Sequence, residues 1–567
     1  MLTAEEIKTI VKNNEDEIHK IRQAIENFRI AIQADILKGC TIIGNLYSKF
    51  IEMKPCIHRY CNDMETIDLS AFVYALQRLP EEITKKYRIY IRKEPDELNN
   101  IPGITKLETK ARRRASYNLG KELLFIAREG ETDIFDILTC LIMYGIEARK
   151  IKDKISMRED ITKDIQNLTT KNEISSEGKN QIIARLSNIL GVKFEDLIKA
   201  DESLDFRLFF ILNNILSIEP EQMAIEFDKS FSKTDDSVKA KKWVEKIVNE
   251  LKKYGDRPIA IISSDTHGVA NCLTGFASEN REKITELAKK DRELSRIEAG
   301  NLSTLYYLLH RLYKKQEYNW LLQEKIAYED KLGITLIKDE YDTGVDVQVI
   351  DLSKILERLP EKIDPRIKFD KEKAKEKGII ILNMDYSFGK QGTHNMRRLC
   401  ETLGKRIDSI SITGKAGITF IGGERFDIML PTHVVPQIIG GIYDFPTGNS
   451  LKAEDFNGLL ETGRIHSGGP VLTVPGTAMQ NDLVFCYYIY FDNILGVEME
   501  AAPYVEAIEK AYKRNQLKKD ILLNVGYWAS DKPLNSKETL AENHMDLGCI
   551  PAYALILATL NKILNKP

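Results

Sequence analysis

The sequence predicts an α/β fold, a three-layer sandwich with a central mixed sheet, preceded by a large all-α region. Apolar residues recur every three or four positions through residues 1–250, which is the period of an amphipathic helix. After residue 256, short apolar runs alternate with helical segments, and many of these runs end in glycines or small polar residues. This alternation is typical of strands and helices that build one α/β sheet.

The helical prediction rests first on a stripe near the start of the chain. The stripe consists of Ile7, Ile10, Val11, Ile18, Ile21, Ile25 and Phe28, with charged residues between its members. Residues 122–149 repeat the pattern, and residues 206–216 are more uniformly apolar, which predicts a buried helix. We therefore expect a helical domain over residues 1–250.

Composition narrows the class of protein. At 567 residues the chain has room for about three domains of roughly 100–200 residues each. Its net charge of -3 provides no field that would draw it to nucleic acid or to a membrane surface. No apolar run approaches the roughly 20 residues that span a bilayer, and residues 1–26 are too charged for a signal peptide. Eight scattered cysteines predict reduced thiols in a cytoplasmic protein.

Two local patterns invite a binding interpretation that we do not favour. Cys56, His58 and Cys61 have the look of metal ligands, but no second ligand cluster follows at zinc spacing, so we expect no metal. Residues 106–114 are basic, and a solvated helix face explains them better than a phosphate site.

Residues 257–264 predict a buried strand that ends at a ligand edge, with a helix from Val269. In open α/β sheets, groups just past the carboxyl ends of strands contact ligands. Asp265 and His267 are therefore candidates, although Asp265 fits the N-cap of the helix equally well.

The second half of the chain gives further strands, and small residues follow them. Strands are predicted at residues 379–383, 407–412 and 425–432, and a glycine-containing turn leads from the first of them into a helix that ends near Leu403. Residues 413–417 (Thr413, Gly414, Lys415, Ala416 and Gly417) predict a loop in which backbone N–H groups approach a ligand. Tyr488 and Tyr490 alternate with Tyr487, which predicts one more strand.

Residues 496–502 read Gly-Val-Glu-Met-Glu-Ala-Ala, an apolar run that ends in two acids, Glu498 and Glu500, before small residues. The pattern predicts a strand that ends in a pocket, with a helix starting behind it. A carboxylate there can hold a sugar diol. The alternative is an acidic first turn that favours the helix dipole.

The order of these segments resembles the nucleoside phosphorylase and nucleosidase superfamily, which includes purine nucleoside phosphorylase, methylthioadenosine nucleosidase and AMP nucleosidase. The resemblance covers about residues 375–567. Its motifs are Ser387-Phe388-Gly389-Lys390, residues 413–417, residues 426–432, Glu498-Met499-Glu500-Ala501-Ala502 and Ser530-Asp531. It implies a nucleoside-phosphorylase-like sandwich, a small-molecule nucleoside or nucleotide as substrate, no cofactor and a homo-oligomer.

The resemblance also implies roles for single residues. Met499 and Glu500 contact the ribose, and Asp531 handles the purine leaving group. The chemistry agrees, because cleavage of an N-glycosidic bond needs a proton for the base and fixed acceptors for the sugar hydroxyls. Asp531 follows an apolar run, where partial burial would raise its pKa. A loop start is the alternative for Asp531, and Glu498 either supports these groups or pairs with a lysine.

The attacking group is predicted to be water. Nucleosidases of the superfamily carry a Thr-Gly-x-Ala-Gly pattern, and residues 413–417 match it, whereas phosphorylases bring an arginine and a serine to phosphate. Lys415 departs from the pattern and can hold a phosphate as a point charge, which leaves a nucleotide substrate open. Asp265 is the first candidate for activating the water and Asp385 the second.

Three domains are expected: a helical domain at 1–250, an α/β segment at 251–370 whose strand is a candidate first strand of the catalytic fold, and the nucleosidase-like domain at 371–567. His433 is a further candidate for a sugar hydroxyl, with a surface histidine as the commoner outcome. Two alternatives to a nucleosidase remain: a phosphorylase, and a sensing scaffold that keeps the pocket without efficient chemistry.

Overall fold

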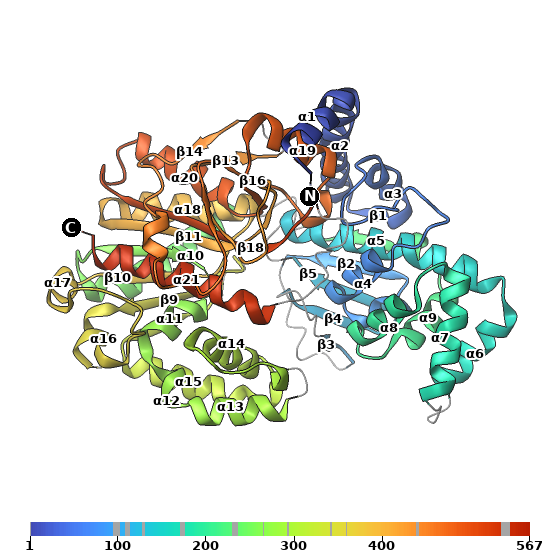
Figure 1. Cartoon of the computed structure of the whole chain (residues 1–567), viewed down its shortest axis with the longest axis horizontal. Helices are drawn as coiled ribbons and strands as arrows, with labels where there is room; N and C mark the ends of the chain where they lie inside the picture. The colour runs from blue at the N-terminus through green and yellow to red at the C-terminus, as the bar shows by residue number, and fades with distance from the viewer. Residues whose placement is uncertain are drawn as a thin grey trace.

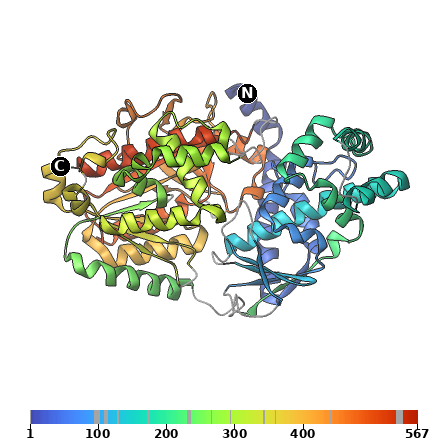
Figure 2. The same cartoon turned by 90° about the horizontal axis from the view of Figure 1, so that it is seen from below.

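The computed structural model describes residues 2–93, 103–107, 114–127, 131–170, 176–229, 236–264, 266–291, 294–340, 343–358, 360–437, 441–534 and 545–566. Figure 1 shows two lobes. The N-terminal lobe is coloured blue to teal, and the larger C-terminal lobe runs from green to red. Figure 2 shows the same division from below. None of the helices in the described ranges is long and apolar enough to cross a membrane.

The N-terminal lobe is rich in helices, as the apolar periodicity predicts. Of the first stripe, every member except Ile10 is buried in the core of this lobe, and Ile10 packs against that core. The helices are α1 (Ala4–Asn13), α2 (Glu15–Lys38), α3 (Ile43–Glu52), α4 (Leu69–Arg78), α5 (Glu131–Ser156), α6 (Glu159–Thr170), α7 (Ser176–Leu190), α8 (Phe194–Ser203) and α9 (Leu208–Leu216).

This lobe is not all-α, because the described residues also form a six-stranded sheet in the order β1-β6-β2-β5-β4-β3. The strands are β1 (Cys40–Ile42), β2 (Arg88–Arg92), β3 (Thr105–Leu107), β4 (Ser116–Leu119), β5 (Glu122–Ile126) and β6 (Ala224–Phe227). The sequence interpretation merged β5 with the helix that follows. Residues 123–126 are all buried, and so short an apolar run does not distinguish a strand from a helix by its periodicity.

The C-terminal lobe is built on a twelve-stranded mixed sheet within the described ranges. Its centre is the parallel set β10 (Ile380–Met384), β7 (Ile259–Ser263), β11 (Ile407–Ile418) and β18 (Leu522–Asp531). The other strands are β8 (Ile334–Ile337), β9 (Val347–Asp351), β12 (Ile428–Leu430), β13 (His433–Pro436), β14 (Tyr443–Asp444), β15 (Ile465–Ser467), β16 (Val471–Thr473) and β17 (Gly496–Glu498).

Helices cover both faces of this sheet, which confirms the predicted three-layer sandwich. Ile259 and Ile261 of β7 pack with α10 (Asp236–Leu251), α18 (Gly389–Leu403) and α20 (Ala501–Lys513). Ala260 and Ile262 point to the other face, which is covered mainly by α11 (Thr266–Thr274), α14 (Leu302–Tyr313) and α21 (Met545–Leu564). Further helices are α12 (Phe276–Glu279), α13 (Arg281–Lys290), α15 (Asn319–Lys331), α16 (Leu352–Arg358) and α17 (Lys371–Lys377).

Two local predictions in this lobe are wrong. Residues 413–417 are not a loop, because β11 continues through them to Ile418, paired with β18 along its length. The three tyrosines lie on the helix α19 (Asp482–Asp492), not on a strand. The side chain of Asn481 caps α19 by accepting hydrogen bonds from the amides of Leu483 and Val484, at 2.9 and 3.2 Å.

The two lobes share apolar core. Helix α19 packs against α1 and α2, and the three lie together at the top of Figure 1. Phe485 and Val497 of the C-terminal lobe are buried in the same cluster as Phe28 and Phe50 of the N-terminal lobe. The N-terminal lobe is therefore packed against β17, the strand that carries Glu498.

Candidate active site

The predicted acidic residues meet around the last turns of β11. Gly417 of β11 is paired with Val497 of β17 on one side and with Asp531 of β18 on the other. Glu498 follows Val497, and Asp531 is the last residue of β18. The structure thus brings the acidic motif and the Ser-Asp pair to opposite sides of one strand.

Glu498 is buried and fully engaged in hydrogen bonds. Its Oε2 accepts the backbone N–H groups of Glu500 at 2.6 Å and Ala501 at 2.7 Å. The hydroxyl of Thr473 donates to Oε1, and that of Tyr527 donates to Oε2 at 3.4 Å. Glu498 therefore caps α20 with its carboxylate, where the positive end of the helix dipole favours an anion.

Glu500 lies at the N-cap position of α20 and is 5% exposed. Only a glycine fits opposite it, since a Cβ built on Gly414 would lie 2.6 Å from Glu500 Oε1 and 3.2 Å from the ring of Tyr527. The carboxyl group accepts the N–H of Met499 at 3.3 Å. Among the described residues, this carboxyl accepts fewer hydrogen bonds than that of Glu498.

The two glutamates titrate far from their usual range. Burial raises the pKa of Glu498 to about 7, against the opposing effect of its hydrogen bonds from Thr473, Ala501, Glu500 and Tyr527. Burial, followed by the negative charge of Glu498, raises the pKa of Glu500 well above its usual value. Two carboxyl groups this close and this buried resist ionising together, so the pair retains a proton near neutral pH.

Asp531 and Ser530 end β18 at a register shift between Ala416 and Gly417. The Ser530 hydroxyl donates to Asp531 Oδ1 at 2.5 Å and lies 3.3 Å from the carbonyl oxygen of Ala416. Both residues are half-buried. The next residue, Lys532, is paired with Glu424 at 2.8 Å, away from Asp531.

Two further predicted binding residues border the cluster. Lys415 is exposed on β11, and its charge lowers the pKa of Glu500 against the larger effects of burial and Glu498. Met499 is half-buried, and its Sδ accepts the Thr477 hydroxyl at 3.5 Å. Thr413, two residues before Lys415 on the same strand, is buried.

Other candidates lie elsewhere. His433 starts β13, whereas Pro436 at the far end of that strand pairs with Thr473, so His433 is at the wrong end of the strand to meet Glu498. Gly389 begins α18, and a Cβ built on it would lie 2.6 Å from Thr132 Oγ1 of the N-terminal lobe. Asp265 lies outside the described residues.

His267, at the start of α11, stacks on His310 of α14 with ring centroids 3.6 Å apart, and so packs between helices. The amide of Asp385 donates to the carbonyl oxygen of Asp346 at 3.1 Å. Neither residue belongs to the contacts that join Glu498, Glu500 and Tyr527.

Sequence reasoning missed the residues that hold the acids in place. Thr473 and Tyr527 position Glu498, and the Tyr504 hydroxyl accepts the amide of Ser387 at 2.8 Å beneath the turn before α18. The available signal for Thr473 was that it closes the short apolar run 471–473, as strand-end residues at ligand edges do. Tyr527 sits inside an apolar run and gives no such signal.

In the described ranges, no group of three or more His, Cys, Asp or Glu side chains has a metal-binding arrangement. Two cavities of about 120 and 110 Å³ lie in the N-terminal lobe. The first is lined by residues of α3 and α5, and the second by residues around α4 and α9. Neither touches the acidic cluster.

Fold and site together define an α/β sandwich protein in which acidic side chains cluster at the end of the central strand β11. The sequence matches the model of a family of unknown function (DUF6909) over residues 43–565, and the chain belongs to that family. No curated protein matches the sequence.

Solved structures similar to this chain include two nucleosidases and a futalosine hydrolase. A 5′-methylthioadenosine/S-adenosylhomocysteine nucleosidase from Campylobacter jejuni is 12% identical over 54% of this chain and 96% of its own, with a TM-score of 0.29. The Streptococcus pneumoniae enzyme with a transition-state inhibitor is 12% identical over 54% of this chain and 99% of its own, with a TM-score of 0.30. A futalosine hydrolase mutant of Helicobacter pylori is 8% identical over 54% of this chain and 99% of its own, with a TM-score of 0.31. Similarity at this level says nothing about what this chain binds.

Proposed function

We propose that the protein hydrolyses the N-glycosidic bond of a purine nucleoside or nucleotide. The observation that carries the proposal is that Glu500 and Asp531 both lie at the end of β11: Glu500 lies against Gly414, and Asp531 pairs with Gly417. Such a reaction needs an acceptor for the sugar hydroxyls and an acid for the leaving base. The cluster offers both groups on rigid elements.

Glu500 is the proposed acceptor for the ribose diol. Glu498 accepts hydrogen bonds from four donors, whereas within the part of the chain that the structure describes Glu500 accepts one, from the amide of Met499. Burial strengthens a hydrogen bond from a sugar hydroxyl, because little water competes for the carboxyl group. The two glutamates thus have different proposed roles: Glu498 caps the start of α20, and Glu500 accepts hydrogen bonds from the sugar.

Asp531 is the proposed acid that protonates the base. The Ser530 hydroxyl, at 2.5 Å from Oδ1, orients the carboxyl group. A proton given to a purine nitrogen as the bond breaks avoids an anionic leaving group, which typically contributes 10²–10⁴-fold in rate.

Water is the proposed attacking group. Arg406, the arginine nearest in sequence to residues 413–417, donates to the backbone carbonyl of Arg257 at 3.4 Å, at the other end of β11. It is therefore not placed to hold an attacking phosphate beside Gly414. Asp265 remains the proposed activator of the water.

The test is incubation of the purified chain with adenosine, inosine, AMP and methylthioadenosine, with and without inorganic phosphate, followed by separation of base and sugar products. We expect free base and free sugar without phosphate. Sugar 1-phosphate that forms only with phosphate would identify a phosphorylase. Binding without any release of base, seen as a raised melting temperature, would identify a sensing scaffold.

Asp531→Asn should lower kcat by about 10²- to 10⁴-fold with little change in substrate binding. Turnover unchanged by this substitution would refute the assignment. The three-domain division, a homo-oligomeric state and a cytoplasmic location remain predictions of the sequence.

A further inference from the structure

A set of buried polar side chains joins α20, the helix that begins behind Glu500, to α18. The two helices pack against each other on one face of the C-terminal sheet (Figure 1). Every member of the set is at most 2% exposed, and the members are Ser263, Ser387, Gln391, Asn395 and Tyr504. We call this set the Tyr504 network. Because water does not reach it, its polar groups need partners inside the protein.

Tyr504 of α20 is the centre of the network. Its hydroxyl oxygen accepts the backbone N–H of Ser387 at 2.8 Å and the hydroxyl of Ser263 at 3.2 Å. Ser263 is the last residue of β7, in the middle of the sheet, and Ser387 lies in the turn between β10 and α18. One hydroxyl group therefore connects a helix, a central strand and a turn.

The same turn is also held from the side of α18. Ser387 Oγ accepts the side-chain amide of Asn395 at 3.2 Å, and Asn395 Oδ1 accepts that of Gln391 at 2.7 Å. A Cβ built on Gly392 would lie 2.7 Å from the carbonyl oxygen of Ser387 and 3.3 Å from Pro503 Cβ, so the turn and α20 approach α18 closely at this glycine. A shift of α20 against α18 would break these contacts.

The network acts on the part of α20 that carries Glu500. Tyr504 lies four residues after Glu500, which is about one helical turn. On the other side of this turn, Glu498 accepts the amide of Glu500 at 2.6 Å and the Thr473 hydroxyl accepts that of Ala502 at 3.1 Å. The first turn of α20 is thus fixed by strands on one side and by the Tyr504 network on the other.

We propose that Tyr504 is a positioning residue, which sets the place of the Glu500 carboxyl against β11 and so determines how strongly the site selects a sugar with both hydroxyl groups. The inference rests on the proposed function, since it takes Glu500 as the acceptor for the ribose diol. One turn of helix is rigid, so a displaced Tyr504 moves Glu500 with it. A misplacement of about an ångström costs on the order of 10²-fold in rate.

Tyr306 provides a matched control. It is 1% exposed on α14, which covers the opposite face of the sheet, and its hydroxyl donates to Asp364 Oδ2 at 3.1 Å. Tyr306→Phe and Tyr504→Phe each remove one hydroxyl group from a buried tyrosine, and each should lower the melting temperature. Only the second removes a contact to the first turn of α20.

The experiment compares kcat/KM for a nucleoside that the wild type cleaves with kcat/KM for its 3′-deoxy analogue. The wild type should prefer the nucleoside, because a site that binds a hydroxyl group rejects a substrate without it. Tyr504→Phe should lower kcat/KM on the order of 10²-fold for the nucleoside and less for the analogue, so that the preference falls by about tenfold. Affinity for the free base should stay unchanged, and Tyr306→Phe should keep the wild-type preference.

A purely structural loss would lower kcat/KM equally for the two substrates. Equal losses in folded Tyr504→Phe, a preference that does not change, or a wild type without any preference would therefore overturn the inference. Ser263→Ala removes one of the two contacts to the Tyr504 hydroxyl and keeps the ring, so it supplies the same comparison if Tyr504→Phe does not fold.

The outcome also separates this inference from the proposed function. If the wild type releases base and Asp531→Asn does not, a result against Tyr504 removes the inference alone. If the wild type cleaves no nucleoside, the proposed function fails and the inference fails with it.

Discussion

The Oε2 atom of Glu498 accepts the backbone N–H of Glu500 at 2.6 Å, so the first acid of the motif holds the second in position. The sequence offered two interpretations of these acids, a helix start and a sugar acceptor. The structure gives the helix start to Glu498, which also binds the amide of Ala501. The sugar role falls, in our proposal, to Glu500 alone.

Gly414→Ala should impair the site. A Cβ at this position would lie 2.6 Å from Glu500 Oε1, so the carboxyl group must move by about an ångström, and such a displacement costs on the order of 10²-fold in rate. Overpacking should also destabilise the protein by about 1–3 kcal/mol. Nucleoside cleavage and a melting curve measure both effects.

Gly300→Ala is the control for this substitution. A Cβ there meets nothing within 4 Å, and the residue is exposed. Equal losses of activity and stability in the two variants would show that the contact between position 414 and Glu500 does not cause the effect. A fully active Gly414→Ala protein would remove Glu500 from the proposed mechanism.

Stability should fall as pH rises through neutrality. The pKa of Glu498 is about 7 in the folded protein against a usual value of 4.5, so the folded state binds the extra proton between these pH values. The contribution of up to about 3 kcal/mol is complete below pH 4.5 and is lost as pH rises through about 7. Glu498→Gln keeps an acceptor oxygen and should make the melting temperature depend less steeply on pH, with Glu500 still titrating, whereas a profile as steep as that of wild type would contradict the shift.

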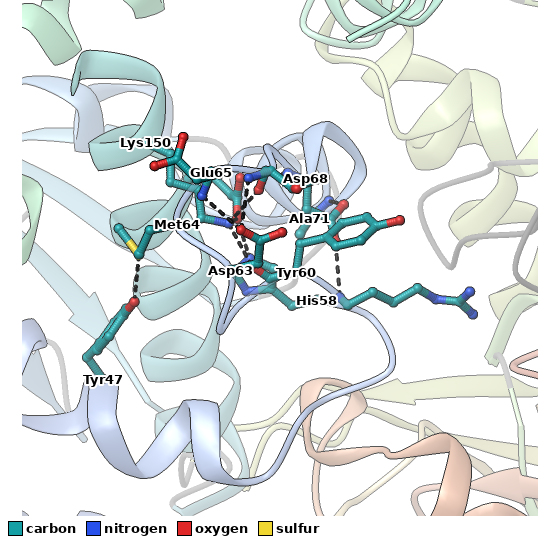
Figure 3. A network of polar contacts seen from close by, with 12 residues as sticks. Tyr47, His58, Tyr60, Asp63, Met64, Glu65, Asp68, Ala71 and Lys150 are labelled. Carbon is teal, nitrogen blue, oxygen red and sulfur yellow. Dashed lines mark hydrogen bonds and ion pairs between the residues drawn. The ribbon is translucent and has the colours of Figure 1, made fainter. Parts of the chain in front are cut away.

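The buried polar network of His58, Glu147 and Lys150 (Figure 3) leads to a prediction about stability. Glu147→Gln removes the carboxylate partner of Lys150, and an uncompensated buried charge costs about 3–5 kcal/mol. Urea or thermal unfolding, followed by a probe in the N-terminal lobe, measures the loss. Glu159→Gln, which breaks only the exposed pair with Lys163, should change the free energy of unfolding by about 0–1 kcal/mol. Similar losses in the two variants would argue against the network.

The local pattern of apolar residues was sufficient to predict those strands and helices whose structure depends mainly on their own residues. The apolar runs at β7 and β10 and the strand-to-helix change at residues 496–502 were predicted within a residue or two, because burial on both faces leaves a continuous apolar run. Residues 413–417 were mistaken for a loop because their glycines read as turn residues. Glycine is needed at positions 414 and 417 because the side chains of Glu500 and Pro533 approach the strand too closely to leave room for a Cβ.

Contacts between distant segments could not be predicted in this way. Thr473 and Tyr527 reach Glu498 from 25 and 29 residues away, and Cys56 meets Gln480 across 424 residues. Nothing in the neighbourhood of Cys56 signals such a contact. The spacing of Cys56, His58 and Cys61 suggested only a metal site, whereas the structure gives these residues separate surroundings.

Lys415→Met separates a nucleoside substrate from a nucleotide. Lys415 is exposed on β11, and its charge lowers the pKa of Glu500, so removing it should raise that pKa further. The limb of the pH–activity profile that reports the ionisation of Glu500 should then move to higher pH. If the lysine also holds a 5′-phosphate, kcat/KM for AMP should fall by about tenfold more than that for adenosine, since a phosphate loses its charged partner. An equal fall for the two substrates assigns Lys415 to the electrostatics of Glu500 alone. Lys163→Met, at an exposed lysine of α6 in the N-terminal lobe, is the control, because its loss should leave the pH profile unchanged.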